Sequence, residues 1–523
     1  MTIDHLSRPS HEADDSGTPA GPAGAPAGNA FRWMVPVLPG LVTLAFGLWR
    51  LTHPALWRDE AATISSAHRS VPELWRMTGN VDAVHGLYYL LMHYHFAVFG
   101  VSALSLRLPS VIAGVVTAAL IAATGSRLAN PRAGLLAGLF WSVLPVMSRY
   151  LQEGRSFSMV AMCVAAAAYF LARRKWVPYA VAVAFVGALN VLSVLSLAGF
   201  AVGILSWWIQ GFSNRREVVR ATIATVVALA VGAAPVALRS HSQSSVLDWI
   251  PKPSSHSLVD LVHAMSGSKE MVIPLLMVAA YGCWRAFRGN RGRFGGTGHE
   301  RQLAALALPL AALPPLLLIA YSLVGSPTYV TRYVLYTLIG AAWLAGLGLD
   351  ALLSLLARLP GRLGSAWNGL LGLVAGTLAV VVVAAFGWPA QEHYRSVNGH
   401  GDRLLGLSQV VRENARPGDG VLFILADRRY AKIAYPSYFR ETEDLMLASS
   451  PASSASLFGE EYPLTELKQR LKGHTRVFVV WSRLAWADNR TDELVQMRSA
   501  GYEAKRTWAL LPSQQVVLWI KTH

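Results

Sequence analysis

The sequence predicts a polytopic α-helical membrane protein that ends in a small α/β domain. Three observations support this fold class. Of the 523 residues, 53% are hydrophobic and only 15% are charged, whereas soluble proteins average about 25% charged residues. Apolar runs long enough for membrane helices recur from Trp33 to Trp388. The tail, 397–523, is polar and alternates helix-like with strand-like runs.

Residues 1–30 are rich in Ala, Gly, Pro, Ser and Asp, and they have too little apolar surface to fold, so we expect a disordered tail. The apolar run that follows begins too late for a signal peptide and is interpreted as a retained first span. Cys163 and Cys283 both lie in apolar runs, which indicates packing rather than a disulfide framework. The net charge of +16 comes with basic residues in short loops between spans, which favours a membrane protein over a nucleic-acid-binding one.

We predict about eleven spans within a transmembrane domain over residues 31–390. Segment 85–99 is also apolar, but it is short and carries three histidines, so we expect it to lie on the outer membrane surface. The basic loops between spans then all face the cytoplasm, as the positive-inside rule favours. The predicted spans are 33–51, 108–124, 133–148, 156–172, 177–193, 196–212, 221–238, 271–285, 303–323, 333–350 and 367–388.

The same placement puts the remaining loops and the tail on the outer face. Residues 391–523 are expected to form an extracytoplasmic α/β domain. Its predicted helices are 402–415, 464–471 and 492–499, and its predicted strands are 421–425, 477–481 and 516–520.

Two acids, Asp59 and Glu60, follow the first span. A carboxylate at the membrane edge is costly unless it is solvated or used. One interpretation is a solvated turn before a helix. The other is a general base, which must lie near an acceptor hydroxyl. Asp59 is the stronger candidate for the base, and Glu60 would bind substrate or neutralise Arg58.

Further polar residues cluster at the predicted outer ends of spans, and each allows two interpretations. Arg107 either reaches the headgroups by snorkelling or binds a phosphate. Arg332 and Tyr333 allow the same choice between an interfacial anchor and a phosphate site. The set Gln152, Glu153 and Arg155 is either a local ion pair or a cluster that faces a substrate cavity.

The histidines of segment 85–99 are weak candidates for metal ligands. His93 and His95 lack the i, i+4 spacing that places two ligands on one helical face, so we expect no metal site there. Tyr88 is either an interfacial aromatic residue or a platform on which a sugar stacks.

The order of these motifs resembles that of the GT-C glycosyltransferases, and most closely the bacterial family-39-like branch related to protein O-mannosyltransferases and lipid A aminoarabinose transferases. The resemblance covers roughly residues 33–390. It departs at His85-Gly86, where His-Pro-Pro is usual. The motifs that carry it are Asp59-Glu60, Asp82-Ala83-Val84-His85-Gly86-Leu87-Tyr88-Tyr89, Arg107-Leu108-Pro109-Ser110, Gln152-Glu153-Gly154-Arg155 and Arg332-Tyr333.

The resemblance implies an inverting transfer of a sugar from a polyprenyl-phosphate donor to an acceptor hydroxyl on the outer face. The acceptor is a glycan, a lipid or a protein, membrane lipids surround the chain, and no cofactor is expected. Asp59 would be the base, and Arg107 and Arg332 would hold the donor phosphate. An alternative is a transporter or flippase of lipid-linked glycans, which would use the arginines but needs no base. The other residues expected to bind substrate are Asp82, His85, Tyr88, Gln152, Glu153, Arg155 and Tyr333.

Overall fold

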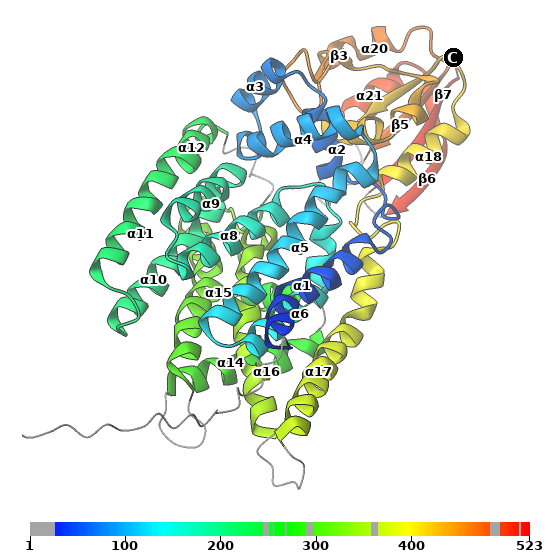
Figure 1. The fold of residues 1–523 in the computed structure, drawn as a ribbon. Helices are drawn as coiled ribbons and strands as arrows, with labels where there is room; N and C mark the ends of the chain where they lie inside the picture. The colour runs from blue at the N-terminus through cyan, green and yellow to red at the C-terminus, as the bar shows by residue number, and fades with distance from the viewer. Residues whose placement is uncertain are drawn as a thin grey trace, which may run out of the picture.

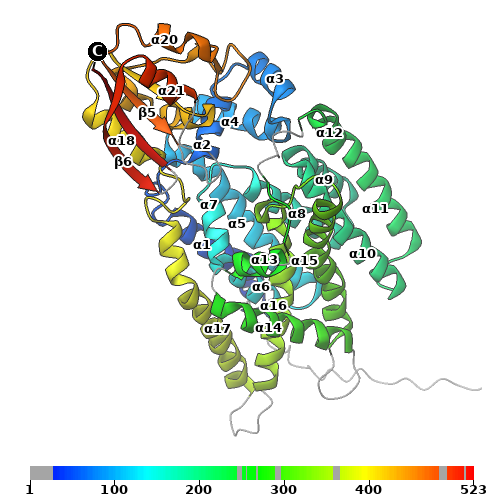
Figure 2. The same ribbon diagram turned by 180° about the vertical axis from the view of Figure 1, so that it is seen from behind.

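The computed structural model describes a helical bundle followed by a sheet domain (Figures 1 and 2). Most of the predicted N-terminal tail lies outside the described residues. These are 27–243, 250–254, 256–266, 269–288, 296–356, 365–481, 492–511 and 514–522.

The bundle contains long apolar helices joined by short turns. Its helices are α1 (Ala27–Leu48), α5 (Ala103–Leu128), α6 (Pro131–Val143), α7 (Pro145–Leu151), α8 (Phe157–Ala172), α9 (Trp176–Leu189), η2 (Val191–Leu195), α10 (Ser196–Ile209), α11 (Arg215–Ala228), η3 (Leu229–Ala233), α12 (Ala234–Ser240), α13 (Ser257–Ser266), α14 (Lys269–Arg288), α15 (Gly298–Val324), η5 (Thr331–Thr337), α16 (Leu338–Leu356) and α17 (Ser365–Tyr394).

Among the described residues, seven helical segments are long and apolar enough to cross a membrane. The pair α6 and α7, bent by 66°, makes an eighth if it is one span. Three shorter apolar helices are Trp33–Leu48, Phe157–Ala172 and Trp176–Leu189. Each predicted span overlaps one of these segments, which confirms the polytopic class, while the number of about eleven spans stays a prediction.

The bend between α6 and α7 has a local cause in the sequence. Leu144 is extended, with φ −62° and ψ 124°, and the next residue is Pro145. A proline disfavours helical backbone in the residue before it, so the helix breaks there. Helix α7 then ends after Leu151, which delivers the polar turn 152–155 to the end of the bundle.

Four short helices cover that end of the bundle, on the side of the sheet domain. They are α2 (Arg58–Ala67), α3 (Val71–Asn80), η1 (Ala83–His85) and α4 (Gly86–Phe99). Helix α4 has only 14 residues and lies across the bundle end rather than along its long helices (Figure 1). This position agrees with the prediction that segment 85–99 does not cross the membrane. The side of the membrane on which it lies stays a prediction.

The sheet domain has a mixed five-stranded sheet with the order β2-β1-β5-β7-β6, and β3 and β4 form a separate pair. Strand β1 pairs in parallel with β2 and β5, while β7 is antiparallel to β5 and β6. The elements are α18 (Leu404–Asn414), β1 (Asp419–Phe423), η6 (Ala426–Arg429), α19 (Tyr430–Ala434), η7 (Pro436–Phe439), β2 (Thr442–Asp444), β3 (Leu447–Ser449), β4 (Glu460–Glu461), η8 (Leu464–Glu466), α20 (Leu467–Arg470), β5 (Arg476–Trp481), α21 (Asp492–Ser499), β6 (Tyr502–Leu511) and β7 (Gln514–Lys521).

The three predicted strands and three predicted helices of this domain are confirmed within a few residues. Strands β2, β3, β4 and β6 were not predicted. One face of the sheet packs on α18 and α19, and the same apolar cluster includes Ala61 and Ala62 of α2. Helix α2 therefore belongs to the cores of both parts of the chain.

Candidate active site

Two adjacent acids on α2 serve different partners. Successive residues of an α-helix point about 100° apart, so Asp59 and Glu60 face different surroundings. Glu60 is fully buried and forms an ion pair with Arg107, which is also fully buried, at 2.7 Å. Arg107 Nη2 donates a second bond, of 2.8 Å, to the other carboxyl oxygen.

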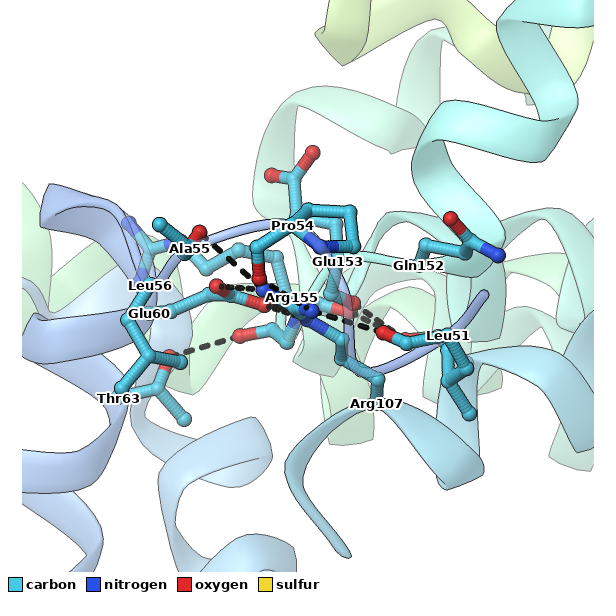
Figure 3. A network of polar contacts seen from close by, with 12 residues as sticks. Leu51, Pro54, Ala55, Leu56, Glu60, Thr63, Arg107, Gln152, Glu153 and Arg155 are labelled. Atoms are coloured by element: carbon cyan, nitrogen blue, oxygen red, sulfur yellow. Dashed lines mark hydrogen bonds and ion pairs between the residues drawn. The ribbon is translucent and has the colours of Figure 1, made fainter. Parts of the chain in front are cut away.

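The remaining Arg107 donors bind backbone carbonyls of the segment between α1 and α2. These are the oxygens of Leu51 at 2.8 Å, Pro54 at 3.0 Å and Ala55 at 3.4 Å (Figure 3). A guanidinium has five N–H donors, and here each has an acceptor. Arg107 therefore fastens the chain that leads into α2.

The 152–155 turn is attached to the same network. Gly154 N–H donates to Glu60 at 3.0 Å, and Thr63 donates to the Gly154 carbonyl at 2.9 Å. Gln152 donates to the Gly47 and Trp49 carbonyls at the end of α1. A side chain at Gly154 would not fit, because its Cβ would lie 2.5 Å from the Leu106 side chain. The Gln-Glu-Gly-Arg motif is thereby held against both α1 and α2.

Asp59 faces the other way and meets two arginines. Its Oδ2 lies 3.6 Å from Arg155 Nε and 3.7 Å from Arg332 Nη1. The Asp59 side chain is 14% exposed. Burial alone would raise the pKa of Asp59, but Arg155 and Arg332 outweigh it, so this pKa lies below its ordinary value. Asp59 is therefore a carboxylate between two cations at neutral pH.

A chain of hydrogen bonds orients Arg155. Its Nη1 donates to the Tyr89 hydroxyl at 2.8 Å, and Tyr89 donates a short bond to Asp82. The Asp82 backbone is left-handed, with φ 60°, a conformation that Asp tolerates better than most residues. The guanidinium of Arg332 lies over the rings of Phe157 and Tyr333, with centroid distances of 5.9 and 5.7 Å.

Glu153 has a different environment from Asp59. Its carboxyl group is turned away from the Glu60–Arg107 pair (Figure 3). Only 1% of the residue is exposed, and neither carboxyl oxygen has a hydrogen-bond partner among the described residues. Burial raises the pKa of Glu153 to about 8, although Arg149 opposes the shift. Glu153 therefore carries a proton at neutral pH.

The histidines of the predicted outer segment divide into two kinds. His85 is buried between Tyr89 and Phe157, and burial followed by the charge of Arg155 lowers its pKa to about 4, so it is neutral. His93 Nδ1 and His95 Nε2 form hydrogen bonds with the backbone carbonyl oxygens of Ala67 and Ser105, at 3.0 and 2.9 Å. Tyr88 is fully buried, and its ring lies beside that of Tyr89 at a centroid distance of 6.1 Å. Within the described part of the chain no three His, Cys, Asp or Glu side chains are placed to hold a metal ion.

Comparisons with known proteins agree with this architecture. Residues 86–238 match a family model described as dolichyl-phosphate-mannose-protein mannosyltransferase. The crystal structure of ArnT from Cupriavidus metallidurans in the apo state is similar with a TM-score of 0.55 and 14% identity, over 94% of this chain and 98% of that chain. The chain therefore has the fold of the GT-C glycosyltransferases.

Two further solved structures share this GT-C fold. ArnT from Cupriavidus metallidurans bound to undecaprenyl phosphate gives a TM-score of 0.54 at 13% identity, over 95% of this chain and 98% of that chain. The Archaeoglobus fulgidus oligosaccharyltransferase tethered to an acceptor peptide gives 0.50 at 11% identity, over 86% and 69%. No curated protein sequence matches the chain. At these identities the likeness concerns the fold.

Within this candidate site the structure brings together most of the predicted residues. Arg107, which was expected to hold a donor phosphate, is fully buried and each of its donors is used by the protein. Glu60, which was expected to bind substrate or neutralise Arg58, pairs with Arg107. These contacts favour a positioning role for both residues. Arg58 pairs instead with Asp402 of the sheet domain at 3.2 Å.

Sequence reasoning missed two residues that border this candidate site. Arg149 lies at the end of α7, with its guanidinium over the rings of Tyr150 and Tyr394. Its place just before the Gln-Glu-Gly-Arg turn, at the outer end of a predicted span, was an available signal. His400 stacks on Trp57. No local pattern pointed to His400, because more than 300 residues separate it from Trp57 along the chain.

Proposed function

We propose that this GT-C protein is an inverting glycosyltransferase that moves a sugar from a polyprenyl-phosphate donor to an acceptor hydroxyl on the outer face of the membrane. The observation that carries the proposal is the meeting of Asp59, Arg155 and Arg332, from three separate elements, at one end of the bundle. The matched family description and the undecaprenyl phosphate bound to ArnT support a lipid-linked phosphate donor.

The reaction needs a base and a site for the leaving group. The acceptor oxygen attacks the anomeric carbon of the sugar while Asp59 accepts its proton. The bond between the anomeric carbon and the phosphate oxygen breaks, and its electron pair leaves with the polyprenyl phosphate. Arg155 and Arg332 stabilise the negative charge that develops on this phosphate. Attack from the face opposite the phosphate inverts the anomeric configuration.

The ion pairs of Asp59 couple donor binding to the strength of the base. Without a donor, Arg155 and Arg332 both lie against Asp59 Oδ2 and hold its pKa low, although burial opposes this shift. A donor phosphate that engages the two arginines neutralises part of their charge. The pKa of Asp59 then rises, because nearby cations are what lowers it. Asp59 becomes a stronger base when the donor is in place.

An apolar groove suits the lipid part of such a donor. It has a volume of about 590 Å³ and lies between α4, α5 and α8. Leu91 in the groove is nearly one helical turn beyond Tyr88, and Met159 is two residues beyond Phe157, so the groove begins beside the polar site. The lining also includes His95, Phe99, Ser102, Leu104, Ser105, Leu108, Pro109, Ile112, Ala113 and Met162. In this proposal it takes the first isoprene units of the donor.

The proposal is tested by incubating the purified protein with a panel of radiolabelled polyprenyl-phosphate sugars. We expect the parent to transfer or slowly hydrolyse one of them. Asp59→Asn keeps the shape of the side chain but cannot accept a proton, so this variant should bind a non-transferable donor analogue and lose turnover. Near-normal turnover by Asp59→Asn would remove Asp59 from the mechanism. Movement of lipid-linked glycan across vesicles without any transfer would favour the transporter instead.

A further inference from the structure

A second group of polar side chains, three buried and one half-buried, lies beside the Asp59 site. It consists of Trp57, Arg149, Glu153 and His400. Trp57 is 7%, Glu153 1% and His400 9% exposed. Six of their polar atoms have no hydrogen-bond partner among the described residues. These atoms are Trp57 Nε1, Arg149 Nε, both carboxyl oxygens of Glu153 and both ring nitrogens of His400.

The linker between α17 and α18, residues 395–403, holds part of this group in place. The ring of Trp57 stacks on the ring of His400, with a centroid distance of 5.4 Å and an angle of 5° between the ring planes. Ala55 N–H donates to the Val397 carbonyl at 2.9 Å, which aligns the segment before α2 with the linker. The Arg58–Asp402 ion pair, at 3.2 Å, joins the same two segments next to Trp57 and His400.

Packing places the group at the N-terminus of α2, next to Asp59. Trp57 directly precedes α2 and stacks on His400, and Gly154, next to Glu153, donates to Glu60. The charges that act most strongly on His400 are those of Glu60 and Arg107, followed by Arg149 and Asp59, and Arg149 and Asp59 act most strongly on Glu153. Glu153 and His400 therefore share Arg149 and Asp59 as charged neighbours.

The unpartnered atoms form a mixed set of donors and acceptors. The Trp57 indole and the Arg149 guanidinium donate only, whereas a neutral histidine and a protonated carboxyl group each donate and accept. Burial lowers the pKa of His400 to about 4, so the ring is neutral near pH 7. With only Arg149 charged, the group suits an uncharged polar ligand better than a second phosphate.

The number of unpartnered atoms indicates how many polar groups that ligand carries. Buried donors and acceptors without partners are costly, so a ligand that belongs here pairs with most of them. A single hydroxyl forms at most three hydrogen bonds and leaves the rest unpaired. A sugar ring has several hydroxyls and a ring oxygen within a few ångströms of each other, which matches this set.

We infer that Trp57, Arg149, Glu153 and His400 form an acceptor subsite for a sugar ring, whose attacking hydroxyl points toward Asp59. The inference rests on the proposed glycosyltransferase function and names its acceptor class as a glycan. Arg155 and Arg332 would hold the donor at the same time. The two substrates then meet at Asp59 from different sides.

The test compares saccharide binding with donor binding in the full-length protein. His400→Phe keeps the ring stack on Trp57 but removes both nitrogens, and His474→Phe, in the sheet domain, is the matched control. Saccharide affinity is measured by calorimetry in the presence of a non-transferable donor analogue. His400→Phe should weaken saccharide binding about tenfold, as expected when hydrogen bonds to a buried ligand are lost, and should leave analogue binding within about twofold. His474→Phe should change neither.

Three outcomes would overturn the inference. One is a parent protein that binds none of the saccharides offered in the calorimetry. Another is unchanged saccharide affinity in folded His400→Phe, checked by gel filtration. The third is a parent protein that glycosylates a serine peptide but no saccharide, which would keep the glycosyltransferase and reject the sugar acceptor. Conversely, saccharide binding that depends on His400, without turnover of any polyprenyl-phosphate donor, would keep the subsite and reject the proposed donor.

Discussion

Removing the Arg107 guanidinium should destabilise the protein rather than weaken donor binding. Arg107→Met keeps the length of the side chain, deletes five hydrogen bonds and leaves the Glu60 carboxylate buried without its cation. Removing one partner of a buried ion pair costs about 3–5 kcal/mol. Since whole proteins are stable by about 5–15 kcal/mol, this loss is a large share of the total.

The assay is equilibrium unfolding in mild detergent by titration with SDS, combined with binding of a donor analogue to the fraction that stays folded. Glu60→Gln should be destabilised to a similar extent, because it strands the buried guanidinium instead. The double variant Glu60→Met/Arg107→Met should lose less than the sum of the two single losses, since no buried charge remains.

Arg332→Met is the matched control for Arg107→Met. The Arg332 side chain is 19% exposed and its ion pair with Asp59 is longer, at 3.7 Å. Arg332→Met should lose affinity for the donor analogue, and its loss of stability should be smaller than that of Arg107→Met. The reasoning about Arg107 would be refuted if folded Arg107→Met had the stability of the parent and failed to bind the analogue. Arg107 would then be a phosphate ligand after all.

Four further predictions concern Glu153, the two arginines beside Asp59 and the membrane topology. Glu153 holds a proton up to pH of about 8 when folded but only to about 4.5 when unfolded, so stability should fall as pH rises between these values; chemical denaturation should show a flatter pH dependence in Glu153→Gln. Above pH 8 Glu153 loses its proton and can no longer donate a hydrogen bond to the acceptor, whereas the amide of Glu153→Gln still donates. The acceptor KM of the parent should therefore rise while that of Glu153→Gln stays constant. Arg155→Lys and Arg332→Lys should each lower turnover, because lysine keeps the charge but loses the forked donor geometry; unchanged turnover in both would place the phosphate elsewhere. In a variant without Cys163 and Cys283, an impermeant reagent should label a cysteine at Val101 from outside and one at Arg173 only from inside; reversed labelling would reject the topology.

The sequence was sufficient to predict the features that depend on local composition. Apolar runs predicted the positions of the membrane helices, because a span needs only enough consecutive apolar residues. The motif order predicted that Asp59, Glu153, Arg155 and Arg332 share one site. In the sheet domain, strands 477–481 and 516–520 are apolar and were found, whereas β2 and β4 are short and polar and were not.

Pairings across the fold could not be predicted from the sequence. Arg58 is next to Asp59 in the chain, and a neighbouring cation was the natural partner for Glu60. The helix instead turns Glu60 toward Arg107, 47 residues away, and Arg58 reaches Asp402 across 344 residues. His400 lies beside Trp57 only because the linker between α17 and α18 runs along the segment before α2.

Helix α2 explains why the sheet domain matters to the site although it carries neither Asp59 nor the two arginines beside it. The predicted boundary at residue 391 falls within α17, which continues to Tyr394, and the cores of bundle and sheet domain meet in α2. Asp59 faces Arg155 and Arg332, Glu60 pairs with the bundle through Arg107, and Ala61 and Ala62 pack into the apolar cluster of the sheet domain. Small side chains at these two positions allow the sheet domain to approach closely. The orientation of Asp59 is therefore fixed from two sides, and a change in the packing of either part shifts Asp59 relative to Arg155 and Arg332.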